Sequence, residues 1–513
     1  MKVLTSLSSV GFLCSLLTSQ YMEAQDSIPA KKISFEQAWE LASQRSHIMK
    51  QTQYLQQEKD QAAKASKGLY LPKVGITASY MVMSDDLTLD LTPVKDAITP
   101  LYSALSKYGN FSGVPNPDPT TNQVVPTLPD NLSTQAVRSQ LASGLTQIQS
   151  ANWDEMIQKK QFGVVAANFQ WPIFVGGKIG VANRVSKIEQ NEAREVTRQK
   201  EGELMSELVE RYYGLCLANQ AIKVRQDVYN GMKQHLDDAQ KMQKQGLIAN
   251  AEVLHAQVYH AQAERELSKA HHTAAILNTA LNNTIASETD STLLPVSELF
   301  YLDTLETADY FKKTAEEKNP LLMQVESKKL LVKQNYNAEK ADYFPSVALQ
   351  GMYDIVNKDL SPYTPDWTVG IGLKWTLFDG AARYRKVKAA RFKSDQVEEV
   401  KVKAEADVTT MIDKLYNELT MYHEQLTELQ TAQTFAEEYL RVREKAFHEE
   451  MSNATEVVDA NLALASVRIE RLQAMYSYDV TLAKLLQYAG IHDEFNAYRN
   501  RSGVKTENYK SDK

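Results

Sequence analysis

Two regions of the 513-residue chain carry one long pattern in duplicate, and this repeat limits the folds that the chain can adopt. Phe169–Gly176 (FQWPIFVG) returns as Leu373–Gly380 (LKWTLFDG), and Ala249–Ala256 (ANAEVLHA) returns as Asn453–Ala460 (NATEVVDA). Both pairs lie 204 positions apart, so the stretch between the motifs has one length in both copies. A fixed length with a drifting sequence is what a long rigid element requires. The repeat therefore predicts two copies of one unit built around such an element.

The first residues have the pattern of a secretory leader. Lys2 is followed by an apolar run, Val10–Leu17, and then by Met22–Ala24, whose Ala24 is a small residue at the expected cleavage point. The apolar run is too short to span a bilayer. We therefore expect residues 1–24 to be a signal peptide.

Charge and cysteine usage exclude several classes of protein. The net charge is −7 and no basic patch is present, so no nucleic-acid partner is expected. Cys14 leaves lipidation open, although Gly-Phe-Leu is a poor context for it. After removal of the leader only Cys216 remains, so no intrachain disulfide can form, and we expect this thiol to be buried. Beyond the leader no run of eighteen apolar residues predicts a transmembrane helix.

Long charged segments predict the helices. Residues 178–245 contain no proline and would span about 100 Å as one helix, and residues 382–449 repeat this segment. Shorter helices are predicted before and after each long one: Phe35–Leu69, Glu252–Asn283, a helix ending at about Asp342, and Thr455–Gln487. Helices of this kind bury a narrow apolar stripe against neighbouring helices, as coiled coils do.

Four segments of about ten residues alternate apolar and polar side chains, and they predict strands at about 73–84, 161–174, 346–356 and 366–378. In the clearest segment Trp367, Ile371 and Trp375 share one face. Such alternation is typical of a membrane β-barrel, although a soluble half-buried sheet would explain any single strand. Trp367 and Trp375 would lie roughly 26 Å apart, which suits two aromatic girdles, and Trp171 holds the place of Trp375 in the first copy.

Four strands cannot close a barrel. The open edges would leave backbone N–H and C=O groups unpaired in lipid, where no water is present to bind them. The chain must therefore oligomerise to be stable in a membrane, although this argument does not set the number of copies.

The first copy carries an insert of 69 residues between its strands, at about 85–160. Gly113–Asp130 is dense in proline and polar residues and predicts a loop, while flanking pieces such as Asp96–Tyr108 suit short helices. Long loops of outer-membrane barrels face outside, so we predict an extracellular insert.

The order of these segments, with the motifs W-x-x-F-x-G-G at Trp171–Gly177 and G-L-x-x-x-x-E-V-L at Gly246–Leu254, resembles the TolC-like outer-membrane efflux proteins over about residues 33–490. The resemblance implies an α+β membrane protein with a duplicated helix–strand–strand–helix repeat. It implies a homotrimer with one twelve-stranded β-barrel in outer-membrane lipid, continued through the periplasm of a Gram-negative bacterium by an α-helical barrel. Such proteins are passive exit ducts that dock a periplasmic adaptor and, through it, an inner-membrane pump; they use no cofactor.

The resemblance also implies a division of the chain. The expected parts are a signal peptide (1–24), a first efflux repeat (25–285), an equatorial connector (286–306), a second repeat (307–490) and a C-terminal equatorial tail (491–513). Together with Asp26–Ser34, the connector and the tail are expected to form an equatorial domain.

The family places a gate at the periplasmic helix tips, with two acidic residues one turn apart. Here these residues are Glu456 and Asp459, which share one helix face, and a trimer would turn each into a ring of three. A capping box with Asn453 explains Glu456 equally well. Glu252 is the first-copy acid, and a favourable charge at a helix N-terminus explains it without a gate.

The tips themselves are expected to contact the adaptor through Gly246, Leu247, Glu450 and Asn453. Gly246 suits a left-handed helix end, whereas the second tip has Glu450 at the matching position. The family's gate-tethering arginine and its tyrosine neighbour correspond to Ser452 and Phe447, so the tethers of that gate are not expected here.

No enzyme motif is present: the histidines form no H-E-x-x-H, and no phosphate loop or G-x-S-x-G occurs. Lone histidines on polar helices are taken as solvated, and no catalytic or metal site is expected. Three functions stay open. They are an efflux duct for small molecules, an exit duct for type I polypeptide secretion, and a periplasmic coiled-coil protein without a pore.

Overall fold

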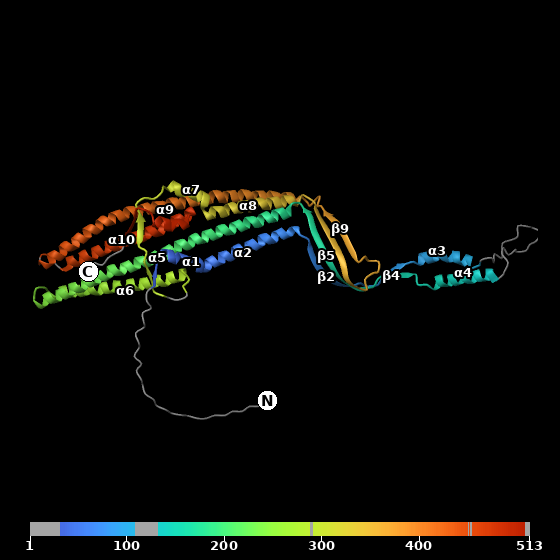
Figure 1. Cartoon of the computed structure of the whole chain (residues 1–513), viewed down its shortest axis with the longest axis horizontal. Helices are drawn as coiled ribbons and strands as arrows, with labels where there is room; N and C mark the ends of the chain where they lie inside the picture. Colours follow the sequence, from blue (N-terminus) through green and yellow to red (C-terminus); the bar gives the residue numbers. More distant parts are fainter. Residues whose placement is uncertain (1–30, 108–131, 288–290, 450, 452–453, 508–513) are drawn as a thin grey trace, which may run out of the picture. The chain divides into compact units, whose positions relative to one another are not determined.

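The structure is a computed structural model and describes residues 31–107, 132–287, 291–449, 451 and 454–507. The predicted signal peptide, Cys14 and the loop 113–130 lie outside these described residues. These described residues form two compact units, one within the ranges 1–59, 189–329 and 396–513 and the other within the ranges 60–188 and 330–395. Figure 1 shows the elements of both.

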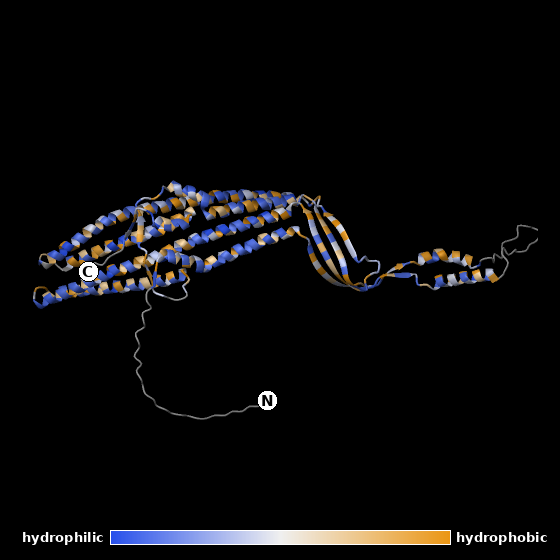
Figure 2. Ribbon diagram, viewed as in Figure 1, coloured by the Kyte–Doolittle hydropathy of each residue, from blue (hydrophilic) through white to orange (hydrophobic). Residues whose placement is uncertain are grey.

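Four long helices form two hairpins (Figure 1). The first hairpin joins α5 (Lys178–Lys244) to α6 (Asn250–Thr284), and the second joins α9 (Ala382–His448) to α10 (Ala454–Ala489). The two long helices end one residue before their predicted limits. Figure 2 shows short apolar stretches on otherwise hydrophilic helices, which is the pattern expected of helices that bury narrow stripes.

The prediction of one helix before each sheet segment is wrong, because each of these helices is broken. The first splits at Ser46 into α1 (Phe35–Arg45) and α2 (His47–Lys67), followed by a 3-10 turn, Gly68–Tyr70. Its counterpart splits at Asn319 into α7 (Ala308–Lys318) and α8 (Pro320–Ala341). The two breaks lie 273 positions apart, as do the first strands of the two copies.

Side-chain caps explain the breaks. Ser46 Oγ accepts the N–H of Ile48 at 3.2 Å, and Asn319 Oδ1 accepts the N–H of Leu322 at 3.1 Å. Each cap satisfies a donor of the following helix that has no partner within that helix. Pro320 adds a second cause, because proline disfavours helical backbone in the preceding residue and fits the first position of a helix.

Three segments predicted to be equatorial come together in the first unit. The strand β1 (Lys31–Ile33) pairs in parallel with β6 (Leu293–Pro295), and β10 (Val504–Glu507) pairs antiparallel with β7 (Leu299–Leu302). The short helices of the tail are a 3-10 turn, His492–Glu494, and α11 (Phe495–Arg499).

An aromatic cluster lies at the centre of this unit. Its fully buried rings come from α1, α5, β7 and α11: Phe35, Tyr212, Tyr213, Phe300 and Phe495. Neighbouring ring centroids are 5.2 to 6.3 Å apart, mostly in tilted or edge-on arrangements that aromatic rings prefer. Cys216 is also buried, as expected, and donates to Ser297 O at 3.4 Å.

The second unit contains one antiparallel four-stranded sheet. Its order is β2 (Lys73–Val82), β5 (Gln161–Val175), β8 (Ser346–Lys358) and β9 (Trp367–Lys374). All three ladders are antiparallel, and within the described residues β2 and β9 are edge strands without a further partner. The sheet is therefore open at both sides.

The predicted strand 366–378 ends early, at Lys374, so Trp375 lies just beyond it. The Trp375 indole N–H donates to Tyr343 O at 3.1 Å, and the Trp171 indole donates to Tyr70 O at 2.9 Å. The two tryptophans are 204 positions apart. Each ties the end of a strand to the segment that leads into the sheet.

The insert is more regular than predicted. It holds a two-stranded stem, β3 (Leu87–Asp90) with β4 (Asp154–Gln158), and two helices, α3 (Thr92–Leu105) and α4 (Leu132–Ser150). Short helices were predicted for flanking pieces such as Asp96–Tyr108, where α3 lies, but no residues were assigned to the helix observed as α4. In the described part of the chain, no helix combines the length and the apolar character needed to cross a membrane.

Candidate functional site

The tip of the first hairpin is a tight turn at Gly246. This glycine has a φ of 75°, in the left-handed region, as its position predicted. Leu247 N donates to Met242 O at 3.0 Å and Gly246 N donates to Gln243 O at 2.9 Å, which is the bond pattern of a Schellman helix end. The turn leaves the Leu247 side chain 57% exposed. An apolar side chain at a hairpin tip is suited to contact another protein.

The second tip repeats one of these bonds. Met451 N donates to Ala446 O at 2.8 Å, 204 positions after the bond from Leu247 to Met242. Met451 takes the place of Leu247 and is 72% exposed. Glu450, Ser452 and Asn453 lie outside the described residues. Both tips therefore present one apolar side chain at matching positions.

Glu456 lies in the first turn of α10, and it is held by an arginine from the preceding helix. Arg443 Nη1 is 2.5 Å from Glu456 Oε2, and the Arg443 guanidinium lies 5.1 Å from the centre of the Tyr439 ring. The ion pair joins the end of α9 to the start of α10. From the sequence, Glu456 was expected either to form a ring of carboxylates in a trimer or to cap the helix, and the ion pair with Arg443 was not predicted.

Asp459 differs from Glu456 in its surroundings. Its neighbours Val458 and Ala460 are buried, whereas Asp459 itself is exposed. It lies one turn after Glu456, so the two carboxylates share a helix face. Asp459 is thus the acid of this pair that is more open to solvent.

His235 lies near the first tip and contacts the second hairpin. Its ring centre is 5.7 Å from that of Phe447, and this contact connects α5 to α9. His235 is only 8% exposed, so the expectation that the histidines are solvated is wrong for this residue. Burial lowers its pKa, although Asp238 and Glu252 act in the opposite direction.

Glu252 lies in the first turn of α6, where a negative charge is favourable. In the first hairpin, the charge of Glu252 acts on His235, whereas in the second hairpin Glu456 forms an ion pair with Arg443. The packing at the first tip is apolar, with Ala239 of α5 against Val253 and Ala256 of α6.

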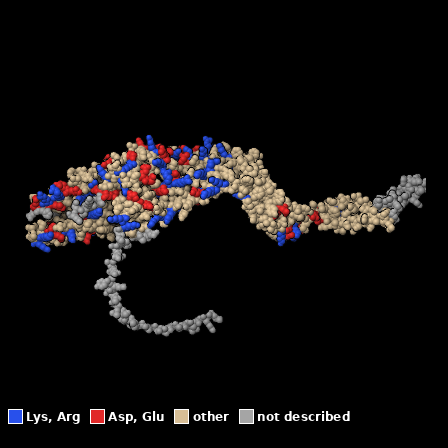
Figure 3. Space-filling model, in the orientation of Figure 1, with Lys and Arg blue, Asp and Glu red and all other residues tan. Residues whose placement is uncertain are grey.

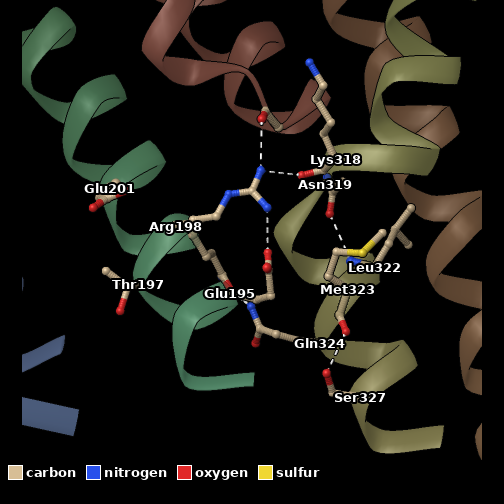
Figure 4. A network of polar contacts seen from close by, with 12 residues as sticks. Glu195, Thr197, Arg198, Glu201, Lys318, Asn319, Leu322, Met323, Gln324 and Ser327 are labelled. Carbon is tan, nitrogen blue, oxygen red and sulfur yellow. Dashed lines mark hydrogen bonds and ion pairs between the residues drawn. The ribbon is translucent and has the colours of Figure 1, made fainter. Parts of the chain in front are cut away.

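A second polar network fixes the other end of the hairpins (Figure 4). Arg198 Nη2 donates to Lys318 O at 3.0 Å and to Gly490 O at 3.4 Å, while Nη1 pairs with Glu195 at 2.7 Å. The two carbonyls belong to the C-terminal ends of α7 and α10, where helices leave acceptors unpaired and a cation is favourable.

A close backbone approach accompanies this network. Gly490 has a φ of 77°, and a Cβ placed there would clash with Lys318 O. Asn319 Nδ2 donates to Tyr488 O at 2.6 Å beside it. Arg198 thus joins two helix ends, and no pattern in the sequence pointed to it.

The two faces of the sheet differ in chemistry. One face exposes apolar side chains, including Val74, Ile76, Trp367 and Ile371, and Figure 3 shows the sheet with few charged residues. The other face holds a hollow of about 720 Å³ whose lining includes the polar side chains of Lys73, Asn168, Gln170, Gln350 and Thr368. A sheet with one apolar and one polar face suits a boundary between lipid and water.

The described residues contain no group of three or more His, Cys, Asp or Glu side chains that could hold a metal ion.

Comparison with known proteins agrees with this picture. The model of the family described as "Outer membrane efflux protein" matches residues 131–287 and 313–491. Among curated proteins, none matches the sequence.

Solved outer-membrane channels have a similar fold. The outer membrane protein VceC of Vibrio cholerae is 12% identical, with a TM-score of 0.63 over 89% of this chain and 96% of that chain. The CmeC outer membrane channel of Campylobacter jejuni is 12% identical, with a TM-score of 0.65 over 89% and 86%. The MtrE outer membrane channel of Neisseria gonorrhoeae, in its open state, is 12% identical, with a TM-score of 0.65 over 89% of both chains.

Proposed function

Because the chain belongs to the outer membrane efflux protein family, we propose that this outer-membrane efflux channel works as a homotrimer. Three four-stranded sheets then close one twelve-stranded barrel, and the helical hairpins continue it as an α-helical barrel in the periplasm. Solutes leave through this duct without any energy input from the channel itself.

The observation that carries the proposal is the open sheet. Edge strands β2 and β9 leave unpaired N–H and C=O groups, and one face of the sheet is apolar. Such edges are costly in lipid unless another strand pairs with them. Pairing β9 of one copy with β2 of the next leaves the four-stranded sheet without an open edge and places the polar hollow on the inside.

We further propose that the channel is the exit duct of a tripartite efflux pump for small molecules. A periplasmic adaptor contacts the hairpin tips at Gly246, Leu247, Glu450 and Asn453, and it links the duct to an inner-membrane pump. The exposed side chains of Leu247 and Met451 support this role, since both tips offer an apolar contact at matching positions. The periplasmic gate at the tips is lined by Glu456, Asp459 and Glu252.

The aromatic girdles lie at the sheet instead and are formed by Trp367, Trp375 and Trp171.

Two measurements test the proposal. The mass of the detergent-extracted full chain should be that of a trimer, and the purified protein should form conducting channels in planar bilayers. A folded, stable monomer in detergent contradicts the barrel, and a trimer that never conducts contradicts the duct and favours a structural protein without a pore.

A further inference from the structure

The insert of the first copy forms a helical hairpin with its own packing. Gly144 of α4 lies against Tyr102 of α3, and a Cβ at Gly144 would be 3.3 Å from the Tyr102 ring. The base of the hairpin is closed by Leu91 N, which donates to Trp153 O at 2.8 Å, and the Trp153 indole N–H donates to Ile148 O at the end of α4 at 2.7 Å. One side of each helix is thus covered by the other helix.

A second stripe on α3 has no partner within the described residues. Val94, Leu101 and Leu105 are 49%, 57% and 39% exposed, and they follow each other at spacings of seven and four. Ala97 and Ala104 lie beside them on the same side of the helix. An apolar stripe with this spacing is the pattern by which helices pack in coiled coils.

The hairpin is also nearly free of charge. Lys95, Asp96 and Arg138 are the charged residues among the 33 residues of α3 and α4, whereas 24% of the whole chain is charged. Figure 3 shows the hairpin with almost no charged surface, and Figure 2 shows apolar residues along α3. This surface offers few charges for ion pairs with a charged partner. Two identical copies of it would meet without electrostatic repulsion.

Polar contacts fix the base of the hairpin to the sheet. Gln158 of β4 donates to Asp359 O at 2.8 Å and accepts the N–H of Ser361 at 2.7 Å, and Tyr363 donates to Glu155 at 3.1 Å. These partners belong to the turn between β8 and β9. The hairpin therefore rises from the same end of the sheet as that turn.

We propose that this stripe is an interface between copies of the chain. It rests on the proposed trimer, in which three stems stand on one rim of the barrel. The α3 helices of the three copies then pack against one another through Val94, Leu101 and Leu105, and they form a helical bundle over the outer mouth of the duct. Any solute leaving the barrel passes around or through this bundle.

Cysteine cross-linking tests the interface. In Leu101→Cys, the new thiols of two copies lie close to each other, so mild oxidation of purified protein should give a covalent dimer. Asp96→Cys is the matched control, because Asp96 is exposed on another side of the same helix. The native Cys216 is buried in both variants. We expect roughly ten times more dimer from Leu101→Cys than from Asp96→Cys, and equal yields overturn the proposal.

A second pair of variants separates this interface from the trimer itself. Leu105→Cys should also cross-link, and adding Leu101→Arg should reduce its yield roughly fivefold because three cations then meet at the interface. Trimer mass and channel conductance are measured on every variant. Conducting trimers without cross-linking overturn the interface alone, whereas monomers overturn the proposed function. In the Leu101→Cys variant, quenching of a thiol-linked fluorophore by brominated lipid would show that the stripe lies on the membrane, which also contradicts the proposal.

Discussion

Arg443 and Glu456 form an ion pair of 2.5 Å that connects the two helices of the second hairpin close to its tip. Since the guanidinium compensates the Glu456 carboxylate, Asp459 is the member of the acidic pair whose charge faces solvent with less compensation. In the sequence the two acids lie one turn apart on one helix face, and a helix cap is the alternative explanation for Glu456 alone. The structure makes them unequal, and this inequality can be measured.

The first prediction concerns ion selectivity. If both acids line the constriction of a trimer, they favour cations in the pore. Asp459→Asn should therefore lower the cation-to-anion permeability ratio more than Glu456→Gln does, by about twofold or more, with little change in trimer stability. The reversal potential of single channels in a salt gradient measures this ratio. Unchanged selectivity in the double variant would mean that neither residue lines the constriction.

The second prediction concerns Arg443. Replacing it with methionine removes the compensating cation, so Glu456 should then add to the cation preference. The loss of stability should be less than about 1 kcal/mol, because the pair is partly exposed. In a Glu456→Gln background, Arg443→Met should change selectivity only by the direct effect of removing the Arg443 charge. A double-mutant cycle of Arg443→Met and Glu456→Gln measures the coupling between the two residues. If their effects on selectivity were additive, the ion pair would have no influence on selectivity.

The sequence was informative wherever a pattern repeats at a fixed distance. The equivalence of Trp171 and Trp375 was readable from the 204-residue spacing, and each indole makes the same kind of bond to a tyrosine carbonyl. The left-handed turn at Gly246 was readable because glycine adopts positive φ at little cost. The family and the mixed helix-and-strand fold follow from such local and periodic signals.

Other features depend on residues far apart in the chain. Arg198 contacts Lys318 and Gly490 only in the folded chain, and the residues next to Arg198 in the sequence contain no pattern that predicts these contacts. The α4 helix has one charged residue, Arg138, among its 19 residues, so it lacks the charge-rich composition by which the long helices were predicted. The break at Asn319 is different, because Asn319-Pro320 was a readable helix boundary that was overlooked.

The third prediction concerns the apolar face of β9. Ile371 is 70% exposed on the apolar face, and Gly372 faces Gln350 on the other side of the strand. Ile371→Arg should destabilise the membrane-inserted protein by about 2–4 kcal/mol if it lies near the membrane midplane. Gly372→Arg should be milder. Heat resistance of the trimer on gels compares the two, and the reverse order would mean that the assigned faces are exchanged.

The fourth prediction concerns the network of Arg198. Arg198→Met leaves the carbonyls of Lys318 and Gly490 without this donor. Because the Arg198 side chain is partly exposed, the loss should be about 0.5–1.5 kcal/mol, and the melting temperature should fall. Arg194→Met is the control, because Arg194 is an exposed arginine one turn away on the same helix. Thermal unfolding followed by circular dichroism checks the difference. Equal losses in both variants would contradict a specific role for the carbonyl contacts.

The last prediction concerns pH and His235. Burial lowers the pKa of His235 below 6.5, so the unfolded state binds a proton more readily than the folded state. The stabilising contribution of neutral His235 is therefore complete above pH 6.5 and is lost as the pH falls below that value. Protonation places a charge between α5 and the Phe447 ring, near Asp238, His255 and Glu252, and it should weaken the contact between the two hairpins.

His235→Phe keeps an aromatic ring at this contact but cannot titrate. Between about pH 7.5 and about pH 5.5, its melting temperature should fall less than that of the native chain. His271→Gln is the control, since His271 is exposed on α6 and should leave the native pH dependence unchanged. His492 has a pKa lowered by burial in the same direction, so the native loss should be reduced but not abolished by His235→Phe. An unchanged pH dependence in His235→Phe would show that protonation of His235 does not weaken the contact between α5 and α9.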